Sequence, residues 1–307
     1  MKRLVLLALA FACTHAATPP ASRDSSIERS DQNAQLLLDV QARFMPELAA
    51  RTGVAGIDDR VSDWLPGHRE RMRDAYKAAL AELQSRRKAE QDPRVAEDLE
   101  ILIHSAQQSI DGIELRERLE VPYVALARNV FGSVRSLLDD QIPQQRRLAA
   151  LVRVRKYAAL DEPGKPSLVQ AHEAEVRDGL ARGLLAPPRI EVENDLHTAK
   201  FLLDGIEKLF EKYQIAGWQQ PVGELRKQLE DYVQFTQSEV LPKARDDFRL
   251  PRELYLFNLK QFGVDIPPED LAQRAHEGFG QIQAEMQTVA KRLGYGDYRE
   301  AIKALKK

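Results

Sequence analysis

The spacing of apolar residues constrains this chain more than any other feature, because beyond residue 30 it has the period of an α-helix almost everywhere. Apolar side chains recur at steps of three and four residues. No alternating run enriched in β-branched residues is long enough for a strand, and proline and glycine separate the periodic segments. We therefore expect an all-α fold of long antiparallel helices in an irregular multi-helix array, with no significant sheet.

The periodic segments and their boundaries predict a series of helices. Prolines at 93, 188 and 268 suit the first turn of a helix, where the missing N–H costs nothing. No repeat of constant period occurs, which argues against a regular solenoid. The predicted helices span residues 31–51, 67–91, 94–119, 122–139, 143–160, 166–183, 188–214, 221–249, 251–262, 267–293 and 296–306.

The segment 221–249 shows how the core is expected to form. Its apolar residues lie on one helical face, and its charged residues lie off that face. Pro242 falls inside this pattern, where its ring and missing donor should kink the helix. The apolar stripe consists of Val222, Leu225, Leu229, Tyr232, Val233 and Val240.

Composition limits the classes of function. Of 307 residues, 43% are hydrophobic and 30% charged, as in an ordinary soluble protein that forms a core. The 45 Lys and Arg residues against 47 Asp and Glu give a formal charge of -2, so we expect no nucleic-acid partner. The single cysteine, Cys13, excludes an intramolecular disulfide and a Cys-rich zinc site.

The N-terminus has the pattern of an export signal. Lys2 and Arg3 precede a short apolar run, and Thr14-His15-Ala16 forms a small-x-small cleavage site. About nine apolar residues are too few to cross roughly 30 Å of hydrocarbon. Cleavage after Ala16 would release the protein into the periplasm. The stretch "LAFAC" partly resembles a bacterial lipobox, so lipidation of Cys13, giving a membrane-anchored lipoprotein, is the alternative.

The domain organisation follows from these patterns. We expect a signal peptide over residues 1–16, a flexible polar linker over 17–30 and a helical domain over 31–307. The sequence "GWQQP" marks a softer boundary inside that domain, at residues 217–221. The membrane is expected as a partner only through the signal peptide or a lipidated Cys13.

Two stretches begin like the zinc-peptidase signature H-E-x-x-H, which places two imidazoles on one helical face. They are "HEAEV" from His172 and "HEGFG" from His276, and neither has a ligand at the fifth position. The helical register places His276 and Glu277 towards water. His172 lies nearer an apolar face, so we expect a half-buried, hydrogen-bonded histidine there.

The remaining candidates for metal-binding or catalytic residues are also weak. Glu193 and His197 share the i, i+4 spacing of two metal ligands, but no third ligand lies nearby, and His68 and His104 are isolated. Phosphate loops, G-x-S-x-G elbows and Ser/His/Asp constellations are absent. From the residues alone we expect no catalytic, cofactor-binding or metal site. A basic run that we interpret as an ordinary amphipathic helix contains Arg146, Arg147, Arg153, Arg155 and Lys156.

The order of several motifs resembles the N-terminal half of a bacterial domain-of-unknown-function family, number 885. The early motif holds Pro46, Gly53 and the pair Asp58-Asp59. The later ones are "LPKAR", the segment Leu250 to Tyr255, "GVDIPPEDL" and the helix that carries "AEM" at Ala284 to Met286. The resemblance runs from about Asn33 to the C-terminus.

The resemblance implies an exported, almost wholly helical protein similar to zinc metallopeptidases of the thermolysin-to-carboxypeptidase Taq type. In that family the metal signature H-E-x-x-P-G-H belongs to the C-terminal half, and this sequence contains no such stretch. We therefore carry over no catalytic residue, and expect zinc only in full-length members. A peptide is the substrate expected of a full-length form.

Two hypotheses of function follow, and the sequence decides neither for nor against an enzyme. In the first, the chain is the substrate-cleft-forming half of an exported zinc peptidase, truncated and inactive alone. In the second, it is a self-sufficient periplasmic helical binding or scaffold protein.

Overall fold

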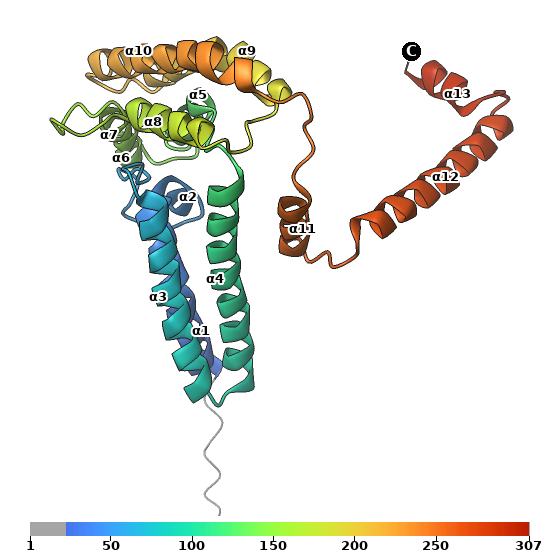
Figure 1. The fold of residues 1–307 in the computed structure, drawn as a ribbon, viewed down its shortest axis with the longest axis horizontal. Helices are drawn as coiled ribbons and strands as arrows, with labels where there is room; N and C mark the ends of the chain where they lie inside the picture. The colour runs from blue at the N-terminus through green and yellow to red at the C-terminus, as the bar shows by residue number, and fades with distance from the viewer. Residues whose placement is uncertain (1–22, 307) are drawn as a thin grey trace, which may run out of the picture. The chain divides into compact units, whose positions relative to one another are not determined.

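A computed structural model describes residues 23–306 and confirms the all-α class (Figure 1). No strand forms in these residues, and an isolated backbone bridge joins Glu120 to Leu185. The helices are α1 (Arg23–Phe44), α2 (Pro46–Arg51), α3 (His68–Ala89), α4 (Pro93–Leu119), α5 (Leu126–Arg135), α6 (Gln144–Arg147), α7 (Ala149–Tyr157), α8 (Leu168–Ala181), α9 (Arg189–Lys212), α10 (Gln219–Phe235), α11 (Arg252–Gln261), α12 (Pro268–Arg292) and α13 (Tyr298–Leu305).

The chain divides into two compact units between Ala244 and Arg245. We expected a soft boundary at 217–221, but Gly217, with φ +75°, instead forms the turn between α9 and α10 inside the first unit. Residues 23–30, which we assigned to a flexible linker, belong to α1. The signal peptide at 1–16, Cys13 and linker residues 17–22 lie outside the described residues.

In the first unit, α1, α3 and α4 lie side by side as a three-helix bundle (Figure 1). Their apolar faces share one core, which includes Val40, Leu83 and Leu99. Asp92 forms the N-cap of α4 by accepting a hydrogen bond from the Arg94 N–H, and Pro93 follows it in the first turn. The short turn before Asp92 makes α3 and α4 an antiparallel pair.

A second core lies among α5, α7, α8, α9 and α10. The stripe predicted for α10 is confirmed, because Val222, Leu225, Leu229 and Tyr232 are all buried. Phe210 of α9 is fully buried and stacks on Trp218, which fixes the start of α10. This core carries one wall of the candidate site described below.

Pro242 ends the helix instead of kinking it, so the predicted extent of this helix, to residue 249, is wrong. After Phe235 the backbone widens into one π-helical turn (Thr236–Val240), in which the Leu241 N–H donates to the Thr236 carbonyl. A short 3-10 turn (Leu241–Lys243) follows, and Ala244 is extended. The wider turn accommodates a proline whose ring would clash with the carbonyl four residues earlier in a regular α-helix.

The second unit consists of α11, α12 and α13, and α12 packs against α13. Its described side chains are mostly exposed, with Leu254, Ala290 and Ala301 as its buried apolar residues. None of the helices among the described residues is long and apolar enough to span a membrane.

Gly179 of α8 allows a close approach that holds α8 against the chain before α5. A Cβ at this position would lie 2.9 Å from the Pro122 ring and 3.3 Å from the Val121 Cα. Neither a proline ring nor backbone yields easily, so we expect Gly179→Ala to lower the free energy of unfolding by about 1–3 kcal/mol. Chemical denaturation of the full chain measures it.

Gly223→Ala is the matched control, because Gly223 lies in α10 with nothing within 4 Å of the added Cβ. Alanine has the higher helix propensity, so this variant should gain up to about 1 kcal/mol. Equal effects of the two substitutions would contradict the close packing at Gly179.

Candidate functional site

An extensive cleft of the first unit has a volume of about 630 Å³, within the range of small-molecule and peptide sites. Its lining comes from the end of α1, α2, the segment 62–64, the start of α3, and helices α5, α7 and α8. Residues from both hydrophobic cores thus meet at one cavity.

A chain of hydrogen bonds forms one wall of this cleft. Tyr157 on α7 donates from its hydroxyl to Glu47 Oε1 over 2.8 Å and lies 2.8 Å from Ser133 Oγ of α5. Glu47 on α2 also accepts from the Ser62 N–H at 3.0 Å and the Ser62 hydroxyl at 2.6 Å. Burial, together with the Glu47 charge, raises the pKa of Tyr157 well above its ordinary value, so its hydroxyl stays protonated as a donor.

Arg153 extends this network into the protein interior. Its side chain is fully buried, and its Nη1 donates to the Ser133 carbonyl at 3.2 Å and to Ser133 Oγ at 3.1 Å. Its Nε and Nη2 have no hydrogen-bond partner among the described residues. A buried guanidinium with one edge unpaired is unusual, because charged groups are rarely buried without partners.

The other members of the basic run are each paired individually. Arg146 donates to Asp58 through two bonds of 2.6 and 2.9 Å, and Lys156 donates to the Asp59 carbonyl. Arg155 pairs with Asp161, and Arg147 lies over the Tyr213 ring. The interpretation as an ordinary helical segment therefore fits the structure, except that Arg153 belongs to the interior.

The segment that holds the early family-like motif lies beside the cleft and lines it through neighbouring residues, among them Glu47, Arg51 and Ser62. Pro46 begins α2, and Gly53 adopts φ +112°, a conformation that favours glycine. The hydrogen bonds of Arg146 lower the pKa of the Asp58 carboxyl, so the pair stays charged at neutral pH. Trp64 closes the segment by donating from its indole N–H to the Pro166 carbonyl at 3.3 Å.

His172 lines the same cleft and has its tautomer fixed by the backbone. Its Nδ1 lies 3.0 Å from the Leu168 carbonyl, which can only accept, so Nδ1 carries the proton and Nε2 is an acceptor. Burial lowers the pKa of His172 despite the opposing charge of Glu175. The side chain is half-buried and hydrogen-bonded, as expected.

His68 at the start of α3 lies beside His172 in the cleft lining, and Nε2 of His68 is 2.9 Å from Glu175 Oε1. Burial raises the pKa of the Glu175 carboxyl, but the hydrogen bond to His68 and the charge of Arg69 together bring it below its ordinary value. The sequence placed His68 alone, yet the fold brings it together with His172 and Glu175.

The other candidate histidines lie elsewhere. His276 and Glu277 are exposed on α12, as the helical register predicted. Glu193 and His197 are exposed on α9, and His104 is exposed on α4. Within residues 23–306, no three His, Cys, Asp or Glu side chains are grouped so that they could hold a metal ion.

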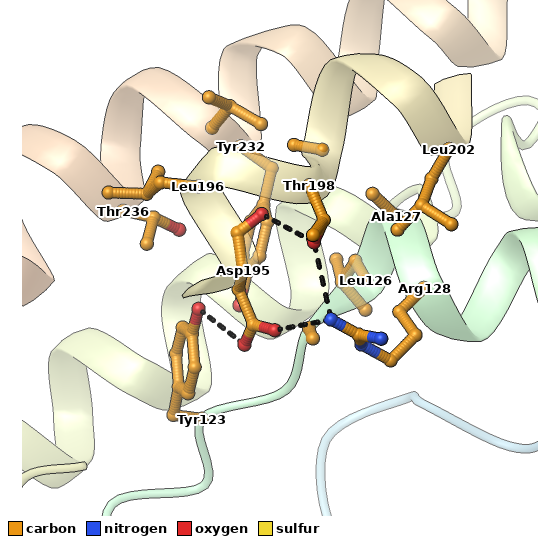
Figure 2. Close-up of a pocket in the computed structure, with 13 residues that line it drawn as sticks. Tyr123, Leu126, Ala127, Arg128, Asp195, Leu196, Thr198, Leu202, Tyr232 and Thr236 are labelled. Atoms are coloured by element: carbon orange, nitrogen blue, oxygen red, sulfur yellow. Dashed lines mark hydrogen bonds and ion pairs between the residues drawn. The ribbon is translucent and has the colours of Figure 1, made fainter. Parts of the chain in front are cut away.

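A smaller pocket of about 20 Å³ adjoins the cleft at Leu126 and Arg128 (Figure 2). Its polar side is a cluster in which Asp195 accepts from the Tyr123 hydroxyl and from Arg128, both at 3.3 Å, and Arg128 also donates to Thr198 at 3.2 Å. Burial, then the Asp195 charge, raises the pKa of Tyr123. About one water molecule would fill this volume, so the pocket is too small for an organic ligand.

Comparison with known proteins gives one family match. A family model described as "Bacterial protein of unknown function (DUF885)" matches residues 46–307, most of the chain, and confirms the resemblance drawn from the motifs. No curated protein matches the chain.

Tyr157→Phe tests the network. The substitution removes the hydroxyl that joins Glu47 to Ser133, so we expect the free energy of unfolding to fall by about 1–3 kcal/mol. Tyr255→Phe, which takes a hydroxyl from an exposed ring, is the control and should change it little. Equal transitions for both variants in urea would show that the network contributes nothing.

The low pKa of His172 predicts a pH dependence of stability. The unfolded chain takes up a proton at this residue below about pH 6.5, whereas the folded chain resists it. Acidification from that value towards the lower folded pKa should therefore reduce the free energy of unfolding, with no further loss from this group below the folded pKa. NMR titration of the His172 ring gives the folded pKa directly.

His172→Gln should reduce this loss of stability on acidification, and the exposed His276→Gln should leave it as in the parent protein. A ring of His172 that titrates at or above the ordinary histidine value would contradict the burial argument.

Proposed function

The chain belongs to the bacterial family of unknown function DUF885, and from this premise we propose that it is the non-catalytic, substrate-cleft-forming part of a zinc-metallopeptidase-like protein, inactive alone. We further propose that it is exported, and that it stays in the periplasm after cleavage at Ala16 or is anchored to a membrane through a lipidated Cys13.

The observation that carries this proposal is the cleft of about 630 Å³, whose lining residues other than Phe44 and Met45 belong to the family-matched region. Its walls combine aromatic and aliphatic side chains with a few fixed polar groups, which is the usual construction of a site for a peptide or small molecule. Asp58 and Gly53, two residues of the family-like motif, shape the loop beside it.

The amino-acid sequence supports the non-catalytic part of the proposal. It contains no H-E-x-x-P-G-H stretch, and both H-E near-misses have an apolar or glycine residue at the fifth position, Val176 and Gly280. Neither of those residues can ligate a metal.

The second unit supports a role within a longer assembly. Phe279, Ile282, Val289 and Leu293 form an apolar stripe along α12 and are between 51 and 61% exposed. Phe262 after α11 is 85% exposed. Exposed apolar surface of this extent is typical of an interaction face, and we propose that it contacts the remainder of a longer protein.

The alternative is a self-sufficient periplasmic helical binding or scaffold protein. The first unit favours it, because that unit contains two hydrophobic cores whose central side chains are fully buried, among them Leu83, Leu99, Val154 and Phe210. A unit packed in this way has the internal contacts needed for cooperative unfolding.

Metal analysis and hydrogen exchange test the proposal on the purified mature chain. After incubation with zinc and dialysis, elemental analysis should find well below one zinc per chain. An unlabelled mixture of short peptides should slow amide exchange in α5 and α8, which line the cleft, and leave the α3–α4 turn, outside the cleft lining, unchanged as an internal control.

Equimolar zinc would overturn the non-catalytic assignment, and unchanged exchange in α5 and α8 would overturn the peptide cleft. The DNA that follows the Lys307 codon separates the two candidates. A frame encoding H-E-x-x-P-G-H supports the first, and its absence from every frame supports the self-sufficient protein.

A further inference from the structure

The acidic groups of the cleft are already engaged by other parts of the protein. Glu47 accepts from Tyr157 and Ser62 through both carboxylate oxygens. Asp63 accepts from Arg71 at 3.0 and 2.7 Å through Oδ2 and from the Leu65 N–H through Oδ1. The charge of Asp63 is thus balanced by Arg71, whereas Glu47 is held in place by neutral donors that occupy both of its oxygens.

The cationic side chains of the cleft differ in whether they have an ion-pair partner. Arg128 is paired with Asp195, and His68 lies against Glu175. Arg51, in the last turn of α2, is exposed and has no hydrogen bond or ion pair with any described residue. Among the described residues that line the cleft, Arg51 is thus the one permanently charged cation without a partner.

The rest of the lining could contact an apolar ligand group and accept a hydrogen bond from one ligand N–H. Phe44, Leu48, Trp64 and Met72 contribute apolar surface. His172 contributes an acceptor, because its Nδ1 is committed to the Leu168 carbonyl and its Nε2 makes no hydrogen bond within the described residues.

From this arrangement we propose that the cleft binds an N-acylated amino acid or the C-terminal end of a peptide, with its carboxylate on Arg51, its apolar side chain against the Trp64 side of the cleft, and an amide N–H donated to His172 Nε2. This inference rests on the proposed peptide-binding role of the cleft and names its ligand class. Arginine suits the carboxylate because its planar guanidinium matches the two oxygens in a bidentate pair.

The probe is N-acetyl-leucyl-leucine with a free carboxylate, compared with its C-terminal amide and with an ester analogue in which oxygen replaces the leucyl amide N–H. Binding is followed by tryptophan fluorescence in the Trp218→Phe background, where Trp64 is the one tryptophan left. N-acetyl-leucine as a separate arm distinguishes a free acylated amino acid from a peptide end.

The acid should bind about tenfold more tightly than the amide, as expected for one charge-assisted hydrogen-bonded pair. Arg51→Gln should abolish this preference, whereas Arg60→Gln, which removes a charge from an exposed arginine outside the cleft lining, should keep it. The ester analogue should bind several-fold more weakly than the amide-containing acid, and His172→Phe should remove that difference.

Equal affinities for acid and amide, or equal effects of the Arg51 and Arg60 substitutions, would overturn the carboxylate assignment and leave the proposed cleft function standing. Absence of binding by all the probes and by the peptide mixture, in protein that unfolds cooperatively, would overturn the proposed function itself.

Discussion

The hydroxyl of Tyr157 is the point on which the arrangement of the first unit depends. It joins a carboxylate on α2, a serine on α5 and its own helix, α7, at one buried position. Through Ser133 the same network reaches Arg153, which is fully buried. Burying polar groups is unfavourable unless they are hydrogen-bonded, so each member of the network is stable only while the others keep their positions. The directional hydrogen bonds of Tyr157 hold three helices in register, whereas hydrophobic attraction alone has no direction and would not fix their relative positions.

This constraint explains the shape of the cleft. Glu47 bonds to both the N–H and the hydroxyl of Ser62, which draws the 52–67 loop towards α2. The same loop is tied to α6 through Asp58 and Arg146, and to the chain before α8 through Trp64. These bonds fix the position of the loop at the edge of the cleft, where Ser62, Asp63 and Trp64 line it. Rigid walls lower the entropic cost of binding, which is why a site built on such a network can bind a small ligand.

The helices and their buried faces could be predicted from the sequence, because a period of 3.6 residues is a local property and the α10 stripe follows directly from it. The network could not. Glu47, Ser133 and Tyr157 lie in three segments up to 110 residues apart, and nothing in the local pattern pairs them. Arg153 sits in a basic run whose other members face solvent or surface partners, so its burial is a property of the tertiary packing. His68 is similarly isolated in the sequence, and it has Glu175 and His172 as neighbours only in the folded protein.

The end of α10 could not be predicted from the sequence, because a proline inside a helical pattern can either kink the helix or end it. The periodicity of the apolar residues is the same in both cases.

The local sequence pattern also does not show how well each of the two units is packed. Periodicity identifies which face of a helix is apolar, but whether that face is covered depends on what packs against it. In α10 the stripe is buried under α7, α8 and α9, whereas in α12 an equally regular stripe through Ile282 and Val289 is exposed. An isolated helix gains little stability from propensity alone and depends on tertiary packing of its apolar face. Because its stripe is largely exposed, α12 gains less stability from tertiary packing than α10 does. A surface that covers this stripe would supply the packing that the second unit, taken by itself, does not provide, which is the role that the proposed function gives to the remainder of a longer protein.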